Sequence, residues 1–191
     1  MRLICGVAYN SKTEYPAWAN GKNLVAYDAW LNMIKRCYNL AVQEKQPTYR
    51  GCSVADEWLD YQDFARWYNR HPNKEIGYHL DKDLLFPGNK VYSPDTCCLV
   101  PMEINQVLLD SAASRGGLPQ GVNWHKRVGK YQVRVGVGGK RRHLGYFDCP
   151  NEAYQTYKIA KEANVKRMAL EWQDRIADNV FQALMNWQLT E

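Results

Sequence analysis

No apolar run in this 191-residue chain approaches the roughly 20 residues that a membrane-spanning helix requires. The first residues, MRLICGVAYNSKTEYP, contain only a short apolar run that Gly6 interrupts, so they make a poor secretory signal peptide. Internal repeats and low-complexity tracts are also missing. We therefore expect a cytoplasmic protein that does not contact a membrane.

The sequence also lacks a C-x-x-C pair, the spacing typical of zinc knuckles and of thioredoxin-like redox sites. Two of its six cysteines are adjacent, which suits neither a tetrahedral zinc site nor an easy disulfide (Cys5, Cys37, Cys52, Cys97, Cys98, Cys149). We expect buried, reduced thiols that fill core space, and no zinc. A zinc site assembled from distant Cys and His residues stays open as the alternative.

Acidic residues are missing from one long segment, residues 111–147. Eight basic residues lie in it (Arg115, Lys126, Arg127, Lys130, Arg134, Lys140, Arg141, Arg142). Since the net charge of the whole chain is +5, the rest of the chain sums to −3. A charge confined to one segment indicates a nucleic-acid binder, whereas an ordinary solvated face would usually intersperse Asp and Glu.

Aromatic residues are plentiful, with 7 Trp and 13 Tyr, and 46% of residues are hydrophobic, so the chain can bury a core. An amphipathic helix is predicted over residues 27–38, because four apolar residues follow the i, i+3, i+4, i+7 spacing (Trp30, Met33, Ile34, Cys37). A second helix is predicted in residues 53–71, with Ser53 as its cap. Its aromatic stripe is expected to form core rather than to stack on bases (Trp58, Tyr61, Phe64, Trp67).

Residues 79–105, HLDKDLLFPGNKVYSPDTCCLVPMEIN, predict two short strands around the turn FPGNK. Pro101 suits the first position of a helix that continues to about Leu109. The small and Gly-rich stretch 111–120 is the best linker candidate in the chain.

After this linker the pattern changes to three short strands, GVNWHKR, KYQVRVGV and RRHLGYF, with glycines at the turns. Alternation in the middle strand places Tyr131 and three valines on one face, which a following helix covers with Ala153, Tyr157 and Ala160. The opposite face, which carries Arg134, is left open and basic. Asp148 or Asn151 is expected to cap that helix, and an amphipathic C-terminal helix follows.

The stretch GVNWHKRVGKYQVRVGVGGKRRHLGYFDCPNEAYQTYKIA resembles the DNA-binding domain of plant ethylene-response factors, the APETALA-type domain, which also occurs in phage and mobile-element nucleases. The resemblance covers about 50 residues and implies double-stranded DNA as partner. It places these positions against DNA: Asn123, His125, Arg127, Arg134, Gly136, Arg141 and His143. Lys130 and Lys140 join them as phosphate contacts. Because the plant domains have Arg or Trp at several of these positions, their target sequence is not transferable.

Residues 27–108 resemble HNH-type proteins of tailed phages, through the elements W-x-x-M-I-x-R-C-Y, Y-S-P-x-x-C and E-I-N. The resemblance implies a ββα-metal nuclease in which Asp81 and Asn105 hold Mg²⁺ or Mn²⁺. The general-base histidine is replaced by Lys82. The central Asn that braces the turn falls on Thr96, so we expect that brace to be missing.

Three candidates for water activation follow. Lys82 can act as a base only if its pKa falls by about three units from near 10.4. His79 lies two residues before Asp81, on the same strand face, and is the second candidate. Activation of a metal-bound water without a protein base is the third.

The overall prediction is an α+β protein with an HNH-like ββα-metal hairpin and flanking helices, followed by a three-stranded antiparallel sheet packed on one helix and a C-terminal helix. Its expected parts are an HNH-like domain (1–110), a linker (111–120), an APETALA-type domain (121–170) and a C-terminal helix (171–191). The predicted function is that of a phage homing endonuclease, which cuts or nicks double-stranded DNA in the host cytoplasm. Alternatives are a catalytically silent DNA-binding protein that regulates transcription or inhibits a host DNA-processing or defence enzyme, and a protein whose aromatic N-terminal half binds a host protein.

Overall fold

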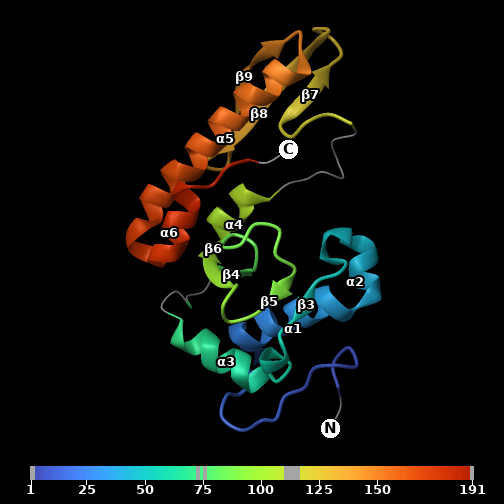
Figure 1. Cartoon of the computed structure of the whole chain (residues 1–191), viewed down its shortest axis with the longest axis vertical. Helices are drawn as coiled ribbons and strands as arrows, with labels where there is room; N and C mark the ends of the chain where they lie inside the picture. The colour runs from blue at the N-terminus through green and yellow to red at the C-terminus, as the bar shows by residue number, and fades with distance from the viewer. Residues whose placement is uncertain (1–2, 72–73, 75–76, 110–116, 190–191) are drawn as a thin grey trace. The chain divides into compact units, whose positions relative to one another are not determined.

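The computed structural model describes residues 3–71, 74, 77–109 and 117–189, and it confirms the mixed α+β class (Figure 1). The chain forms two compact units, Met1–Met102 and Glu103–Glu191. The division falls before the predicted linker, most of which lies outside the described residues. Among the described residues no helix is long and apolar enough to cross a membrane.

Within the described residues, the first unit contains three α-helices, two 3₁₀ helices and three two-stranded sheets. The helices are α1 (Val25–Tyr38), α2 (Leu40–Lys45), η1 (Pro47–Tyr49), η2 (Asp56–Trp58) and α3 (Tyr61–Arg70). The strands are β1 (Trp18–Ala19), β2 (Lys22–Asn23), β3 (Ser53–Val54), β4 (Tyr78–Asp81), β5 (Val91–Tyr92) and β6 (Cys98–Pro101). Strands β1–β2 and β4–β6 pair antiparallel, and β3–β5 pair parallel.

The core of this unit lies between α1 and α3 and is dominated by aromatic side chains. Trp30 of α1 is fully buried, and its indole Nε1 donates to the carbonyl oxygen of Trp58 at 2.7 Å. Phe64 packs edge-on against Trp58, with ring centroids 5.0 Å apart. Burying each ring contributes roughly 1.5–3 kcal/mol. The predicted helix over residues 27–38 and its core stripe are confirmed.

The predicted start of the second helix is wrong. Ser53 lies in β3 and pairs with Val91, which holds the chain extended there. The helix α3 begins at Tyr61, after Asp60, whose Oδ1 accepts a hydrogen bond from the Gln62 amide at 3.1 Å. Asp60 is thus the cap, because pairing with β5 prevents helix geometry at Ser53.

The N-terminal segment, to which the sequence assigned no role, is attached to α3 by the buried side chain of Gln62. Its Oε1 accepts from the amides of Glu14 and Tyr15 at 2.9 and 2.7 Å. Its Nε2 donates to Asn10 Oδ1 at 2.7 Å and to the Tyr15 carbonyl oxygen at 3.0 Å. The Gln62 side chain is only 2% exposed and makes four hydrogen bonds, and it thereby holds residues 10–15 against the helix.

The predicted hairpin forms with a different connection. Strand β4 pairs with β6 in the register Tyr78↔Pro101 to Asp81↔Cys98. The residues directly after the turn FPGNK do not return along β4; as β5 they pair with β3 instead. The prediction failed here because the partner strand, residues 53–54, is distant in sequence.

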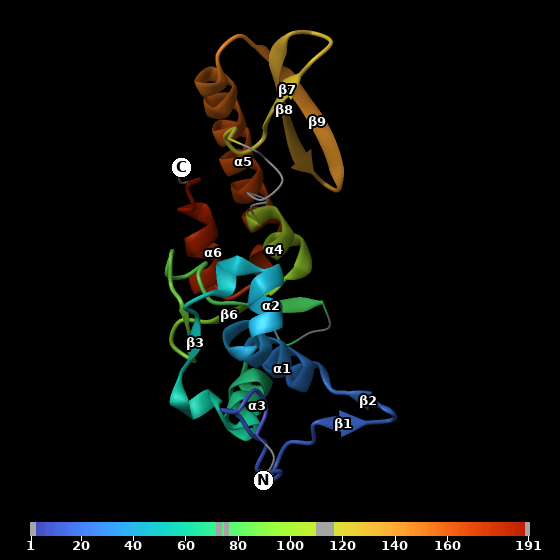
Figure 2. The ribbon, with the colours of Figure 1, turned by 90° about the vertical axis from the view of Figure 1, so that its right-hand side faces the viewer.

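The second unit consists of a three-stranded antiparallel sheet in the order β7-β8-β9, and helices. Its elements are α4 (Met102–Leu108), which starts at the division between the units, β7 (Val122–His125), β8 (Lys130–Val137), β9 (Lys140–Phe147), α5 (Pro150–Trp172), η4 (Gln173–Arg175) and α6 (Asp178–Met185). Helix α5 lies along one face of the sheet (Figure 2). The break at η4 and the following α6 confirm the predicted C-terminal helix.

The face of the sheet that packs on α5 is the one predicted from alternation. Val133 and Val135 of β8 are buried with Val122 of β7 against Ala153 and Tyr157 of the helix. No helix of the described residues covers the opposite face, where Arg134 and Gly136, which alternate with these valines, are exposed.

Two local features of the second unit were predicted from the sequence, the turn between β8 and β9 and the cap of α5. Gly138 and Gly139, both with positive φ (57° and 73°), form the turn between β8 and β9, as predicted. The predicted cap of α5 is wrong: Cys149 precedes the helix, Pro150 is its first residue, and no side chain of the described residues caps it. Asp148 binds Lys130 instead, with 3.0 Å between Oδ2 and Nζ.

Candidate functional site

The exposed face of the β7-β8-β9 sheet brings together five of the predicted DNA contacts. Asn123 of β7 pairs with Gln132 of β8, and Arg134 of β8 pairs with His143 of β9. Gly136 pairs with Arg141. Directly opposed residues of paired strands share a face, and these lie opposite the valines that pack on α5. This surface, together with His125 at the end of β7, is called the outer face below.

The remaining predicted contacts lie at the margins of the outer face. Arg127 is exposed in the turn between β7 and β8, and Lys140 begins β9 next to the Gly138–Gly139 turn. Lys130 is engaged with Asp148 at 3.0 Å. The predicted set therefore lies on one face of the sheet and at its margins, and one of its cations, Lys130, is paired with a carboxylate.

One residue of the outer face was missed from the sequence. Tyr146 of β9 lies directly opposite Gln132 and is 40% exposed. Its ring lies 4.6 Å from that of His143 and 5.3 Å from that of His125, measured between centroids. The signal was available, because Tyr146 precedes Phe147, which packs in the core, and alternation then places it outside.

In the first unit, Asp81 ends β4 and uses its side chain to shape the following turn. Its Oδ1 accepts from the backbone amides of Asp83 and Leu84 at 3.0 and 2.8 Å. Burial and the nearby carboxylate of Asp83 raise the pKa of Asp81, and the two amides oppose that shift. A carboxylate in such a position gains from a cation, and its second oxygen is not used by these hydrogen bonds.

Lys82 has a structural environment. Its side chain is buried, and Nζ donates to Asp83 Oδ2 at 2.8 Å and to the carbonyl oxygen of Asn89 at 2.9 Å. The ring of Tyr92 lies 5.9 Å from the same nitrogen. All three contacts engage this nitrogen within the fold, whereas a general base must reach the attacking water. This environment therefore argues against Lys82 as the base.

The brace of the turn is present, so the expectation that it is missing is wrong. Asn89 Nδ2 donates to the carbonyl oxygens of Lys82 and Val91, both at 2.7 Å, and its Oδ1 accepts from the Val91 amide at 3.0 Å. Thr96 adds a hydrogen bond from Oγ1 to the same Val91 carbonyl at 2.9 Å. Asn89 was missed because the brace is made by contacts across the loop, which spacing alone does not reveal.

His79 and Asn105 complete the predicted nuclease set. His79 lies two residues before Asp81 in β4, on the same side of the strand, and is exposed. Asn105 lies in α4, which follows β6 directly. It belongs to the second compact unit, whereas Asp81 belongs to the first. Carboxylate and amide oxygens are the donors that Mg²⁺ and Mn²⁺ take. Among the described residues no three His, Cys, Asp or Glu form a group that could hold a metal ion, and the shared Asp81–Asn105 site stays a prediction.

The cysteines are all free thiols. Cys37, Cys52, Cys97 and Cys98 are buried, as expected, while Cys5 and Cys149 are half-buried. Burial raises the pKa of the Cys37 and Cys97 thiols to about 12, so both stay protonated and unreactive at neutral pH.

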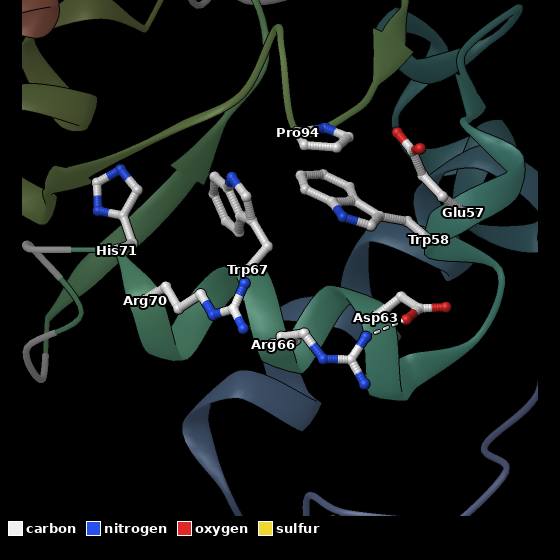
Figure 3. Close-up of a pocket in the computed structure, with 8 residues that line it drawn as sticks. All are labelled: Glu57, Trp58, Asp63, Arg66, Trp67, Arg70, His71 and Pro94. Atoms are coloured by element: carbon white, nitrogen blue, oxygen red, sulfur yellow. Dashed lines mark hydrogen bonds and ion pairs between the residues drawn. The ribbon is translucent and has the colours of Figure 1, made fainter.

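A pocket of about 520 Å³ lies beside the aromatic core (Figure 3). Its lining combines aromatic and charged side chains (Glu57, Trp58, Asp63, Arg66, Trp67, Arg70, His71, Pro94). The indoles of Trp58 and Trp67 meet edge to face at 4.8 Å, and the Pro94 ring lies over Trp58. Arg66 is bound to Asp63 at 2.5 Å and to Glu14 at 3.2 Å. The tryptophans that line the pocket are thus part of the core packing. Its acidic side chains, Glu57 and Asp63, are matched by the basic side chains of Arg66 and Arg70.

No family model, curated protein or solved structure matches this chain. The features that bear on function are therefore the outer face, the β4–β6 strand pair and the resemblances carried by the sequence.

Proposed function

We propose that this chain is a double-stranded DNA-binding protein of the HNH homing-endonuclease type, which cuts or nicks DNA with the help of Mg²⁺ or Mn²⁺. The outer face is the observation that carries the proposal. It is one face of a sheet, its opposite face is packed on α5, and its exposed side chains include Arg134 and Arg141.

A small antiparallel sheet fits the major groove of B-DNA, where arginine can pair with the O6 and N7 atoms of guanine. We assign Arg134 and Arg141 of the outer face to base edges. We assign the rim cations Arg127 and Lys140, which are exposed at its margins, to the phosphates that flank the groove. Phosphate contacts of this kind supply much of the affinity and make it sensitive to salt.

The nuclease part of the proposal follows the order of elements in the chain: β4 with Asp81 at its end, the return strand β6, then α4 with Asn105. Asp81 and Asn105 would hold the divalent ion, which supplies charge stabilisation at the scissile phosphate when bound. The general base is assigned to His79, because it is exposed on the Asp81 side of β4 while the Lys82 ammonium is engaged.

The test is incubation of supercoiled phage and host DNA with the protein in Mg²⁺, Mn²⁺ or EDTA. Asp81→Asn is the informative variant, because Asn Oδ1 still accepts from the Asp83 and Leu84 amides while the charge is removed. Metal-dependent nicking that disappears in Asp81→Asn and in His79→Ala supports the proposal. Lys82→Met is expected to destabilise the loop but to retain cleavage in the protein that stays folded.

The second candidate is a DNA-binding protein without cleavage, which acts by regulating transcription or by inhibiting a host enzyme. The engaged side chain of Lys82 favours it, since the position of the family's catalytic histidine now serves the fold. Salt-sensitive DNA binding without cleavage of any substrate, in either metal, would establish this candidate in place of the first.

A further inference from the structure

The outer face contains a polar side chain that is buried, although no helix of the described residues covers this side of the sheet. Gln132 is only 6% exposed, whereas Arg134 and Gly136, which lie on the same face of β8, are exposed. Tyr146 is directly opposite Gln132 in the strand register. Tyr146 is 40% exposed, so of this directly opposed pair the tyrosine is the one accessible at the outer face.

The orientation of Tyr146 is held from several sides. The rings of His125 and His143 flank it at 5.3 and 4.6 Å, and Gln132 Nε2 donates a hydrogen bond to its hydroxyl oxygen at 3.1 Å. A side chain held in this way loses little conformational freedom on binding. It is a pre-organised contact rather than a mobile surface residue.

The direction of the hydrogen bond determines what Tyr146 offers to a ligand. An amide Nε2 can only donate, so the phenolic oxygen is the acceptor and its own proton is directed elsewhere. Because Tyr146 is 40% exposed and its hydroxyl oxygen accepts from Gln132, that proton can be donated to a partner that approaches the outer face. Tyr146 thus presents a hydrogen-bond donor at the centre of the surface.

We propose that Tyr146 reads a base edge: its hydroxyl donates to an acceptor in the major groove and thereby excludes cytosine at one position of the contacted strand. The inference rests on the proposed function, that is, on DNA binding by the outer face. In the major groove guanine presents N7 and O6, adenine N7 and thymine O4 as acceptors, while the edge of cytosine presents only its amino donor. A donor that Gln132 holds in place therefore discriminates between cytosine and the three bases that present an acceptor. Arg134 and Arg141 would read guanine at other positions and do not supply this discrimination at the Tyr146 contact.

The experiment selects bound duplexes from a randomised pool and then measures the Kd of the preferred duplex and of every single-base-pair change in it. It compares the full chain with Tyr146→Phe, Gln132→Glu and Tyr154→Phe.

Tyr146→Phe keeps the ring and its histidine contacts but removes the donor, so discrimination against cytosine should fall roughly fivefold at one position only. Gln132→Glu should give the same loss, because a carboxylate accepts the phenolic proton and turns it inward. Tyr154→Phe is the matched control, since the Tyr154 hydroxyl is buried in the core and makes no hydrogen bond to any described residue.

Three results would overturn the assignment while DNA binding stands: no base preference in the unmodified chain, unchanged discrimination in Tyr146→Phe, or an equal loss of affinity on every sequence. The last result would mean a phosphate contact. If the unmodified chain binds no duplex even at low salt, the proposed function itself fails, and the base-reading role of Tyr146 fails with it. Thermal unfolding of each variant shows whether a change in selection reflects a change in folding, and Tyr146→Phe carries the conclusion if Gln132→Glu does not fold.

Discussion

At the scale of single residues, the loop after β4 explains why a lysine stands where a catalytic histidine was expected. The Lys82 ammonium closes the loop by reaching the Asn89 carbonyl, and the Asn89 side chain reaches back to the Lys82 carbonyl. The two residues are reciprocally bonded. Substituting either one removes a partner of the other and leaves buried polar groups unsatisfied.

Asn89→Ala removes three hydrogen bonds that brace this loop, and we expect it to lower the free energy of unfolding by about 1–3 kcal/mol. The measurement is chemical denaturation followed by tryptophan fluorescence. Asn23→Ala is the control, because its amide makes one exposed hydrogen bond, to Asp28, and the expected loss is within about 0.5 kcal/mol. Equal losses in the two variants would show that Asn89 does not brace the loop.

His71 should make stability depend on pH. Burial lowers its pKa below the ordinary 6.5, so the native state resists a proton that the unfolded chain accepts. The stabilisation is therefore complete above pH 6.5 and is lost as the pH falls below that value. NMR titration should place the His71 pKa below 6.5, and His71→Gln should flatten the fall in stability between pH 7 and 5. An equally steep fall in His71→Gln would contradict this assignment.

At the scale of secondary-structure elements, the contact between β7 and α5 depends on a glycine just before the strand. Gly121 has a φ of +75°, and a Cβ at this position would lie 2.1 Å from the ring of Tyr157. The opening glycine of the APETALA-type resemblance thus has a physical role: it lets the helix approach the first strand. Neither the positive φ nor the close approach tolerates a larger residue.

Gly121→Ala is expected to cost about 1–3 kcal/mol of stability, because the ring of Tyr157 must move and the backbone is strained. Gly136→Ala is the matched control, since a Cβ there meets nothing within 4 Å on the outer face. Thermal unfolding followed by circular dichroism compares the two. A smaller loss in Gly121→Ala than in Gly136→Ala would contradict the packing argument.

At the scale of the whole molecule, basic residues gather in one segment while the remainder of the chain is net acidic. The structure puts part of that charge on a single exposed sheet face, the arrangement that steers a protein to DNA through phosphate contacts. We therefore expect the affinity for DNA to fall steeply as the salt concentration rises, whether or not the protein cleaves DNA.

The double variant Arg134→Ala/Arg141→Ala should bind duplex DNA more weakly. The double variant Arg127→Ala/Lys140→Ala removes the rim cations instead, and it should reduce the slope of log K against log salt by up to about 2, roughly 0.9 for each phosphate that is no longer neutralised. Arg167→Ala is the control, because Arg167 lies on α5 and is paired there with Glu171. Fluorescence anisotropy between about 50 and 300 mM salt, the range over which such binding weakens strongly, gives both quantities. An unchanged affinity in Arg134→Ala/Arg141→Ala would remove the outer face from the interface.

The sequence by itself determined the features that repeat at short range. These are the stripe of α1, the alternation of β8, the Gly138–Gly139 turn and the segregation of charge, because spacing of 3.6 or 2 residues places side chains on one face before any tertiary contact forms. It also located six of the outer-face positions, but it missed Tyr146.

Tertiary structure alone decided the pairs that are distant in sequence. Strand β5 pairs with β3 rather than with β4, Gln62 binds the N-terminal segment, Asn89 braces the loop, and Gln132 orients Tyr146. Each of these depends on strand register or on a buried hydrogen bond whose partner no periodicity specifies. Such contacts are selected by the need to satisfy buried polar groups in the folded chain, and that need arises only once the two segments have met.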